Sequence, residues 1–393
     1  MLQQMEIAEL LNDRSRQDSE RSFFYAVGCG CCALLLMMFG LTMLYSTTYA
    51  TAGEKLFHKQ LFWAVASLAV MGGVIFLGYR RIGSLNCSFW LMLVVLVLLG
   101  IALCSHPVNG ARRWIFLPGF QFQPSEMAKV VLPLYAAGVC AENLRSIADF
   151  HQWKTLLRPA LLMAAVPAMV MLGHDLGTTM LLLAGLCALI VISGIQKRFF
   201  ILPLLGVAVI FALVALFSPV RMARITSFTN PEAVEIREAK GYQLWTSLLA
   251  LGSGSWKGIG FMESRMKQRY LPESHTDFIL SIVGEELGFL GMLAVAGVYL
   301  LFGWFGMQIA LHARSRFGML LAATLTTIIV LQAGINIGVV AGGLPTKGIS
   351  APFISYGGSN LVMTMAMVAL LISIGLENVP GLADRWWGRK KGE

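Results

Sequence analysis

Long apolar runs alternate with short polar segments along most of the 393-residue chain. Most of these runs approach the ~20 residues that an α-helix needs to cross a bilayer. The pattern predicts an all-α integral membrane protein with ten transmembrane helices. The predicted spans are 23–45, 59–78, 86–104, 125–141, 157–173, 176–194, 199–217, 278–309, 318–340 and 360–376.

The polar segments predict how the rest of the chain is organised. Residues 1–22 are expected to form a polar N-terminal tail, residues 23–376 one membrane domain, and residues 377–393 a basic C-terminal tail. The longest polar segment, 218–277, forms a large loop between the seventh and eighth spans. Within this loop GYQLWTSLLALGSGSW places an apolar face at Trp245, Leu248 and Leu249, which predicts a short helix that lies in the membrane interface or dips into it.

Lysine and arginine are distributed unevenly between the two sides of the predicted membrane domain. With a cytoplasmic N-terminus, sixteen of these residues fall in cytoplasmic segments and six in the short outer loops. Segment 218–277 is left out because long loops cross membranes largely regardless of charge. The asymmetry predicts that both termini are cytoplasmic and that the long loop lies outside.

Composition agrees with a membrane location. The chain is 57% hydrophobic and 13% charged, and soluble domains are typically about 25% charged. A formal net charge of +9 would suggest a nucleic-acid partner in a soluble protein, but here the basic residues lie mostly in short loops. No aromatic–basic RNA-binding motif is present, so we expect membrane lipid and no nucleic acid among the partners.

The stretch YLPESHTDFI closes the long loop just before the eighth span. Ser274 and Asp277 are three residues apart before an apolar run, which matches a helix capping box. A carboxylate fixed at a helix start also suits a general base, which needs defined geometry and access to a proton. Both interpretations of Asp277 are open on spacing alone, and His275 is interpreted as a polar neighbour.

The stretch NGARRWI places two arginines, Arg112 and Arg113, on a predicted outer loop. Arginine at this place opposes the general excess of positive charge on the cytoplasmic side. One interpretation is that both side chains reach the interface beside Trp114. The other is that a guanidinium group binds phosphate, for which its geometry is well suited.

The stretch QPSEMAK begins the fourth span with Pro124 at the first helical position. Glu126 and Lys129 are three residues apart and can form an ion pair on one helical face. Helix capping and this pair explain most of the pattern. Charges near membrane depth are also typical of functional sites, so both residues are candidates for one.

Two more polar stretches lie next to predicted spans. In HDLGTT, Asp175 is interpreted first as part of a tight turn that caps a helix. GLPTKGISAPFISYGGSN is rich in glycine and proline, and irregular backbone near a membrane is expected to be buried or to line a wet cavity. Lys347 in this segment either meets a phosphate or extends to the interface, and Ser359 is a candidate N-cap of the tenth span.

In this order, the stretches resemble the SEDS family of bacterial cell-wall proteins (FtsW, RodA and SpoVE). The resemblance covers about residues 24–376 and rests on GA-x-RW, QPSE-xx-K, DLGT, RI-xx-F-x-NP, GYQ, YLPE-x-HTDFI, GEELG and LPTKGI-xx-PFISYGGS. Pro345-Thr346-Lys347 resembles the division-specific FtsW branch more than RodA. SpoVE shares this pattern, so roles in elongation and sporulation stay open as alternatives.

The resemblance implies an enzyme of the bacterial cytoplasmic (inner) membrane at the division septum. Family members are ten-span glycosyltransferases that polymerise lipid II into the glycan strands of peptidoglycan. They act with a class B penicillin-binding protein, which supplies the transpeptidase, and with other divisome membrane proteins. An older proposal makes them lipid II flippases, and the low buried charge of the central spans here favours glycosyl transfer over that alternative.

The resemblance also assigns site residues. Asp277 matches the proposed catalytic aspartate and Arg113 matches a family arginine, whereas Arg112 stands at a variable position. The remaining residues expected to bind substrate are Glu126, Lys129, Asp175, Glu285, Lys347 and Ser359.

No cofactor is certain from the resemblance. A divalent cation, magnesium or manganese, stays open as a candidate, although the sequence shows no dedicated set of metal ligands. The chain also departs from the family pattern in ways that leave the details of the acceptor groove open. These departures are Gly173, His174, Thr246, Met266 and Asn360.

Overall fold

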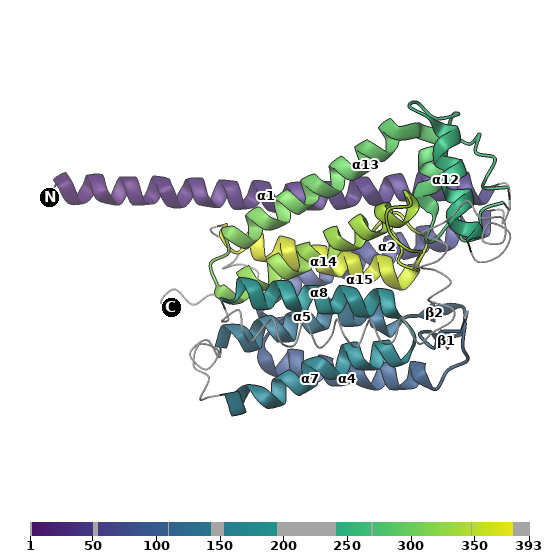
Figure 1. The fold of residues 1–393 in the computed structure, drawn as a ribbon. Coiled ribbons are helices and arrows are strands. Elements are labelled where there is room, and N and C mark those ends of the chain that lie inside the picture. The colour runs from purple at the N-terminus through teal and green to yellow at the C-terminus, as the bar shows by residue number, and fades with distance from the viewer. Residues whose placement is uncertain are drawn as a thin grey trace.

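The fold is taken from a computed structural model, which describes residues 2–49, 54–108, 110–142, 153–194, 241–268, 270–346 and 348–379. Most of the helices run side by side as one bundle (Figure 1). They are α1 (Leu2–Tyr49), α2 (Glu54–Leu77), α3 (Tyr79–Ile82), α4 (Leu85–Leu103), α5 (Pro124–Glu142), α7 (Trp153–Leu172), α8 (Leu176–Ile192), α12 (Tyr242–Gly254), α13 (Ile279–Leu311), α14 (Arg316–Val340) and α15 (Gly358–Leu376).

The centre of the bundle is formed by α14 and α15. In the most apolar stretch of these two helices 67% and 83% of the residues are buried, against 17% for α2 and 22% for α13. α15 packs against α1, α2 and α5, and α14 packs against α5, α8 and α13. The peripheral helices therefore keep apolar faces on the outside of the molecule, as expected where lipid replaces water.

The helices agree closely with the predicted spans. Nine of the ten spans coincide with helices in the described ranges, and the seventh, 199–217, lies outside those ranges. Six described helices, namely α1, α2, α4, α13, α14 and α15, are long and apolar enough to cross a membrane, and 157–172 and 176–192 are shorter apolar helices. The chain is thus a multi-pass helical membrane protein, and the number ten stays a prediction.

Two features of the fold differ from the sequence expectation. The helix of α1 begins at Leu2, so it runs through most of the predicted tail 1–22 and extends beyond the bundle (Figure 1). The loop before α5 contains an antiparallel hairpin of β1 (Ile115–Leu117) and β2 (Phe120–Phe122), whose turn includes Gly119 at a φ of 87°. Strands of three residues carry too little alternation to be recognised in a sequence.

α13 is broken at Gly288, where φ is 69° and ψ is −167°. Such a break frees backbone groups on both sides, and these groups need new partners. Segment 255–260 supplies them: Ile259 N–H and Gly260 N–H donate to the carbonyls of Glu285 and Glu286 at 3.0 and 3.1 Å. From the other side, Phe289 N–H donates to the Ser255 carbonyl at 2.8 Å. The long eighth span therefore bends, and the loop before it is held at the bend.

α12 confirms the helix predicted within the long loop and packs closely on α13. Its buried face includes Leu244, Ser247 and Ala250, whereas Leu249 on the predicted apolar face is exposed. The two helices approach at Gly254, where an added Cβ would lie 1.9 Å from the Gly284 carbonyl oxygen. The contact leaves no room for a side chain at this glycine.

We expect Gly254→Ala to destabilise the protein by about 1–3 kcal/mol, because the new methyl group would force α12 away from α13. Thermal unfolding of the purified protein in detergent measures the effect. Gly252→Ala on the same helix is the matched control, since nothing lies within 4 Å of its added Cβ. Equal melting temperatures for the two variants would contradict the close approach.

Candidate active site

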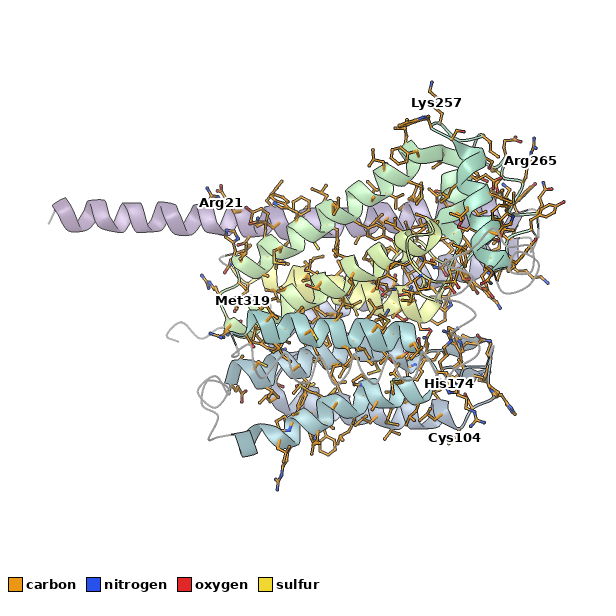
Figure 2. The ribbon with its side chains drawn as sticks, viewed as in Figure 1. Arg21, Cys104, His174, Lys257, Arg265 and Met319 are labelled. Atoms are coloured by element: carbon orange, nitrogen blue, oxygen red, sulfur yellow. The ribbon has the colours of Figure 1, made fainter. Side chains whose placement is uncertain are left out.

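A cavity of about 1500 Å³ opens at the end of the bundle that carries α12 and the hairpin. Figure 2 marks this end with His174 and Arg265, opposite Arg21 and Met319. Six of the eight predicted site residues line the cavity, namely Arg113, Glu126, Lys129, Asp175, Asp277 and Ser359. Segments separated by more than 200 residues in the sequence therefore contribute to one charged chamber, and the roles of these residues stay predictions. Lys347 lies outside the described residues.

Asp277 stands just before α13 and does not occupy the capping position. The helix begins at Ile279, and the N-cap residue is Phe278, which makes no side-chain cap hydrogen bond. The capping-box interpretation of Ser274 and Asp277 is therefore wrong. Another interaction sets the turn, because the Glu273 carbonyl accepts from Thr276 N–H and Phe278 N–H at 3.1 and 3.2 Å.

The backbone around Asp277 is held by three donors from the C-terminal part of the chain. Tyr356 N–H donates to the His275 carbonyl at 3.0 Å. The Ser355 hydroxyl donates to the Thr276 carbonyl at 2.7 Å, and Asn336 Nδ2 donates to the Asp277 carbonyl at 2.8 Å. Each of three adjacent carbonyls has its own partner, so the segment is fixed although it is neither helix nor strand.

Asp277 and Arg113 meet at Gly348. A Cβ added to Gly348 would lie 3.1 Å from Asp277 Oδ2 and 3.6 and 3.8 Å from the two terminal nitrogens of Arg113. Only a residue without a side chain leaves this space open. Within the described part of the chain, buried Arg113 Nε has no hydrogen-bond partner, so it is a donor available to an anion. The arrangement combines a carboxylate and a guanidinium group around one small space.

Arg112 differs from Arg113 in orientation. Its side chain is exposed and donates to the Leu103 carbonyl at 3.1 Å, while its backbone N–H donates to the Gly173 carbonyl at 3.0 Å. An added Cβ at Gly173 would lie 2.7 Å from the Arg112 carbonyl oxygen. Gly173, one of the departures from the family pattern, thus lets this loop approach the turn before α8.

Glu126 and Lys129 form the ion pair that their spacing predicted. Lys129 Nζ lies 2.6 Å from Glu126 Oε2 and donates to Gln332 Oε1 of α14 at 2.8 Å. Both charged side chains are almost completely buried at the wall of the cavity, at 1% and 6% exposure. α5 begins at Pro124, as expected, and this start places the pair on the face that meets α14.

Asp175 caps α8, which confirms the turn interpretation. Its carboxylate accepts from Thr178 N–H and from the Thr178 hydroxyl, and Oδ2 also accepts from Gln123 Nε2 and Ser125 Oγ, both at 3.0 Å. These bonds join the start of α5 to the start of α8. Asp175 thus lines the cavity with an oxygen that already has several donors.

Two other predicted residues lie differently from the expectation. Ser359 is not the N-cap of α15, because the helix begins at Gly358 with Gly357 as the cap residue. The Ser359 Oγ instead accepts from Gln123 N–H at 3.4 Å. Glu285 is buried and is not among the residues that line the cavity. Its carboxylate accepts from the Ser264 hydroxyl and from Arg265 N–H, so it holds the loop before Asp277.

The neighbouring Glu286 forms a second buried ion pair that the sequence analysis missed. Lys267 Nζ lies 2.8 Å from Glu286 Oε1, and the Ser46 hydroxyl of α1 donates to the same carboxylate at 2.7 Å. Lys267 Nζ also donates to the Met262 carbonyl at 2.6 Å. The pair fastens the loop between α12 and α13 to α1, and neither of its residues is among those that line the cavity.

Gln332, Asn336 and Ser355 were also missed. Gln332 and Asn336 are four residues apart on the apolar helix α14, and such spacing of amides could have marked a polar stripe. Ser355 lies in the glycine- and proline-rich stretch that was expected to be buried or to line a cavity, and its side chain is buried. The signal was present in both places, but the partners, which are backbone carbonyls, cannot be read from a sequence.

His275 is a neighbour of the site, as predicted, and does not line the cavity. Its ring lies 5.9 Å from the ring of Tyr356. Burial lowers the pKa of the His275 imidazole, and the Glu273 carboxylate opposes this shift. The ring is therefore held toward its neutral form and does not add a cation near Asp277.

Three other departures from the family pattern also have places in the structure. Asn360 lines the cavity and donates to the Ser350 hydroxyl at 2.7 Å. Thr246 bonds back to the Tyr242 carbonyl within α12 at 2.7 Å, and Met266 packs against the large apolar core. Of these three residues only Asn360 can meet a ligand in the cavity.

The residues that the structure describes form no cluster of the usual metal ligands. Across the described ranges, no three side chains of histidine, cysteine, aspartate or glutamate come together in a way that could hold an ion. The carboxylates of Glu126 and Asp175 are occupied by lysine, amide and hydroxyl donors.

Fold and cavity together define a multi-pass helical membrane protein with a charged chamber at one end of its bundle. Comparison with known proteins identifies the group more closely. Residues 28–379 match the family model FTSW_RODA_SPOVE, described as cell cycle protein. The chain belongs to this FtsW/RodA/SpoVE family.

Relatives and solved structures agree with this family. A protein of Alcanivorax borkumensis named "Probable peptidoglycan glycosyltransferase FtsW" is 37% identical over 88% of this chain and 91% of its own length. One of the same name from Acinetobacter baylyi is 35% identical over 87% of each chain.

Among structures, a chain of a peptidoglycan synthase complex superposes with a TM-score of 0.74 at 26% identity, over 90% of this chain and 98% of its own. The rod shape determining protein RodA of Thermus thermophilus superposes with a TM-score of 0.66, also at 26% identity, over 89% of this chain and 96% of its own. The described bundle is therefore a RodA-like fold.

Lys129→Met is expected to destabilise the protein by about 3–5 kcal/mol, because it leaves buried Glu126 without its cation. The double variant Glu126→Gln/Lys129→Met removes both charges and should recover most of the loss. Thermal unfolding in detergent measures both. Lys59→Met, at an exposed lysine on the same cavity, is the matched control and should change little. A double variant as unstable as Lys129→Met would contradict this account of the pair.

Proposed function

We propose that this protein is a peptidoglycan glycosyltransferase that polymerises lipid II into glycan strands during septal cell-wall synthesis. The observation that carries the proposal is the meeting of Asp277 and Arg113 at Gly348, inside a large cavity of a FtsW/RodA/SpoVE family member. The names of the FtsW relatives supply the reaction class. The geometry supplies a carboxylate and a cation in one place, which glycosyl transfer from a pyrophosphate requires.

In the proposed reaction Asp277 is the general base. It takes the proton from the 4-hydroxyl of the terminal N-acetylglucosamine of one substrate. The oxygen then forms a bond to the sugar C1 of the other substrate, and the bond from C1 to the undecaprenyl pyrophosphate breaks. Attack from the face opposite the leaving group inverts the configuration at C1. The pyrophosphate departs with the electron pair of the broken bond.

Arg113 is proposed to stabilise the departing pyrophosphate. Charge that develops in a transition state is best stabilised by donors already fixed in position. Arg113 is held beside Trp114, with 6.0 Å between the guanidinium carbon and the ring centre, and its Nε has no hydrogen-bond partner among the described residues. Lys347, which follows Thr346 at the cavity, is proposed as a second cation on the basis of its sequence position alone.

Other carboxylates are less suited to the role of base. Glu126 is paired with Lys129, and Asp175 accepts from a backbone amide, two hydroxyls and a side-chain amide. These contacts hold both carboxylates in fixed positions at the cavity wall. Their proposed part is to shape the wall that binds substrate, together with Ser359. For Glu285 the proposed part is indirect, through the loop that it holds.

The proposed setting is the cytoplasmic membrane at the division septum, with both termini in the cytoplasm and the cavity on the outer face. The domain boundaries proposed are a membrane domain over 23–376 of ten spans, with terminal tails on either side. A class B penicillin-binding protein is the proposed partner, together with other divisome proteins. The FtsW name of the relatives and the charge asymmetry of the loops support this setting.

The decisive experiment compares lipid II polymerisation by wild-type protein and Asp277→Asn, each with the penicillin-binding partner. Asparagine keeps the size of the side chain but cannot accept a proton at neutral pH. Loss of a general base typically slows a reaction by ~10²–10⁴-fold, and the fold should survive because no helix cap is lost. A folded variant with near-normal glycan synthesis would remove Asp277 from the mechanism. Translocation of lipid II without polymer by the wild type would favour a flippase.

The orientation can be tested by labelling single cysteines from outside intact cells, in a background without native cysteines. Lys257 and Arg314 are exposed and lie in the loops before and after α13. A membrane-impermeant maleimide should label Lys257→Cys and spare Arg314→Cys, because the positive-inside rule places only the first outside. The reverse pattern would invert the topology.

A further inference from the structure

Asn336 lies behind the cavity and joins two segments that form it. Nδ2 donates to the Asp277 carbonyl at 2.8 Å and to the Ile349 carbonyl at 2.7 Å. The two acceptors are 59 and 13 residues away in the sequence. One amide nitrogen therefore fixes the distance between the backbone of the proposed base and the backbone of the loop opposite it.

The same two segments meet a second time at the site itself. Gly348, the residue before Ile349, is the glycine whose added Cβ would lie 3.1 Å from Asp277 Oδ2. Asn336 holds the backbones on the buried side, and the carboxylate faces Gly348 on the cavity side. A change in the distance between the Asp277 and Ile349 backbones must therefore change the distance between the Asp277 carboxylate and Gly348.

The Asn336 side chain acts through the N–H donors of its amide nitrogen, Nδ2. It is 1% exposed, and its Oδ1 has no hydrogen-bond partner in the described part of the chain. A buried acceptor without a partner is costly, because it loses its hydrogen bonds to water. The reverse orientation of the amide would place Oδ1 against two carbonyl oxygens and lose both hydrogen bonds. The observed orientation leaves Oδ1 unsatisfied but allows Nδ2 to make both hydrogen bonds.

One turn away on α14, Gln332 makes a parallel connection. Its Nε2 donates to the Ser350 carbonyl at 2.8 Å, and its Oε1 accepts from Lys129 at 2.8 Å. The two amides thus fasten the loop 348–350 at adjacent points along one helix. Gln332 lines the cavity but Asn336 does not, so Asn336 has no contact with a ligand there.

We propose that Asn336 is a positioning residue, which sets the place of the Asp277 carboxylate relative to Gly348 and Arg113 through the Asp277 backbone. The proposal rests on the proposed function and assigns one more residue to the same reaction. Because Asn336 acts through Asp277, its loss should slow the chemical step and leave the binding of lipid II largely intact.

The test measures initial rates of lipid II polymerisation by the full-length protein with its penicillin-binding partner, over a range of lipid II concentrations. Asn336→Leu has nearly the same shape as asparagine but no donor. We expect its maximum rate to fall by about 10²-fold, the scale of a 1 Å misplacement, with a nearly unchanged half-saturating concentration. Thr324→Val is the control, since it removes a buried hydroxyl that bonds only within α14, and it should keep the wild-type rate.

A double-mutant cycle separates positioning from a general structural role. In the Asp277→Asn background, Asn336→Leu should cause no further loss of rate, although it lowers the melting temperature as it does alone. An equal fractional loss in both backgrounds would overturn the proposal, as would a folded Asn336→Leu with the wild-type maximum rate.

If Asn336→Leu does not fold, Asn336→Ser decides the question. Its single hydroxyl is too short to reach both carbonyls and introduces no bulk. The proposal is supported if Asn336→Ser lowers the maximum rate of otherwise wild-type protein but causes no further loss in the Asp277→Asn background. A wild-type maximum rate for Asn336→Ser overturns it. The proposed function is judged separately, by the activity of wild type and Asp277→Asn, so that failure of one can be distinguished from failure of the other.

Discussion

Three adjacent backbone carbonyls, those of residues 275–277, need donors inside a membrane protein, and the site depends on which groups supply them. Buried carbonyls are almost always paired, because water is not there to replace a missing partner. Here the donors come from α14 and from the segment just before α15. The loop that carries the proposed base is therefore irregular in shape but fixed by buried side chains and backbone of the C-terminal part of the chain.

The buried ion pairs Glu126–Lys129 and Glu286–Lys267 follow the same principle, since their charged groups also have hydrogen-bonding partners. Lys129 pairs with Glu126 and also donates to Gln332. Lys267 pairs with Glu286, and both bond to the Ser46 hydroxyl. Each pair combines opposite charges with a neutral polar group, which offsets the cost of removing the charges from water. The first pair faces the cavity and the second fastens the loop to α1. Charge in this protein thus stands where segments distant in the sequence must meet.

Hydropathy was enough to predict most of the helices, because a bilayer leaves few choices for an apolar run of about 20 residues. Local chemistry was also enough for Pro124 at the start of α5 and for Asp175 as the cap of α8. It failed at Asp277 and Ser359, where cap-like spacing is present but the helices begin at Ile279 and Gly358, so neither spacing forms the expected cap. It also missed the break at Gly288 and the three donors to residues 275–277, because these depend on partners brought together only by the complete fold. The resemblance to a family pointed to Asp277 where spacing alone could not decide.

The donors to residues 275–277 also determine when the site can form during synthesis of the chain. Ser355 is 79 residues beyond Thr276, so a ribosome working at about 5–20 residues per second adds it about 4–16 s later. Until then the Asp277 segment has the Asn336 amide but lacks the Ser355 hydroxyl and the Tyr356 backbone N–H. A chain that stops before Ser355 would carry Asp277 and Arg113 without two of the three donors that hold the segment. The complete arrangement around Asp277 can therefore form only after Tyr356 has been added.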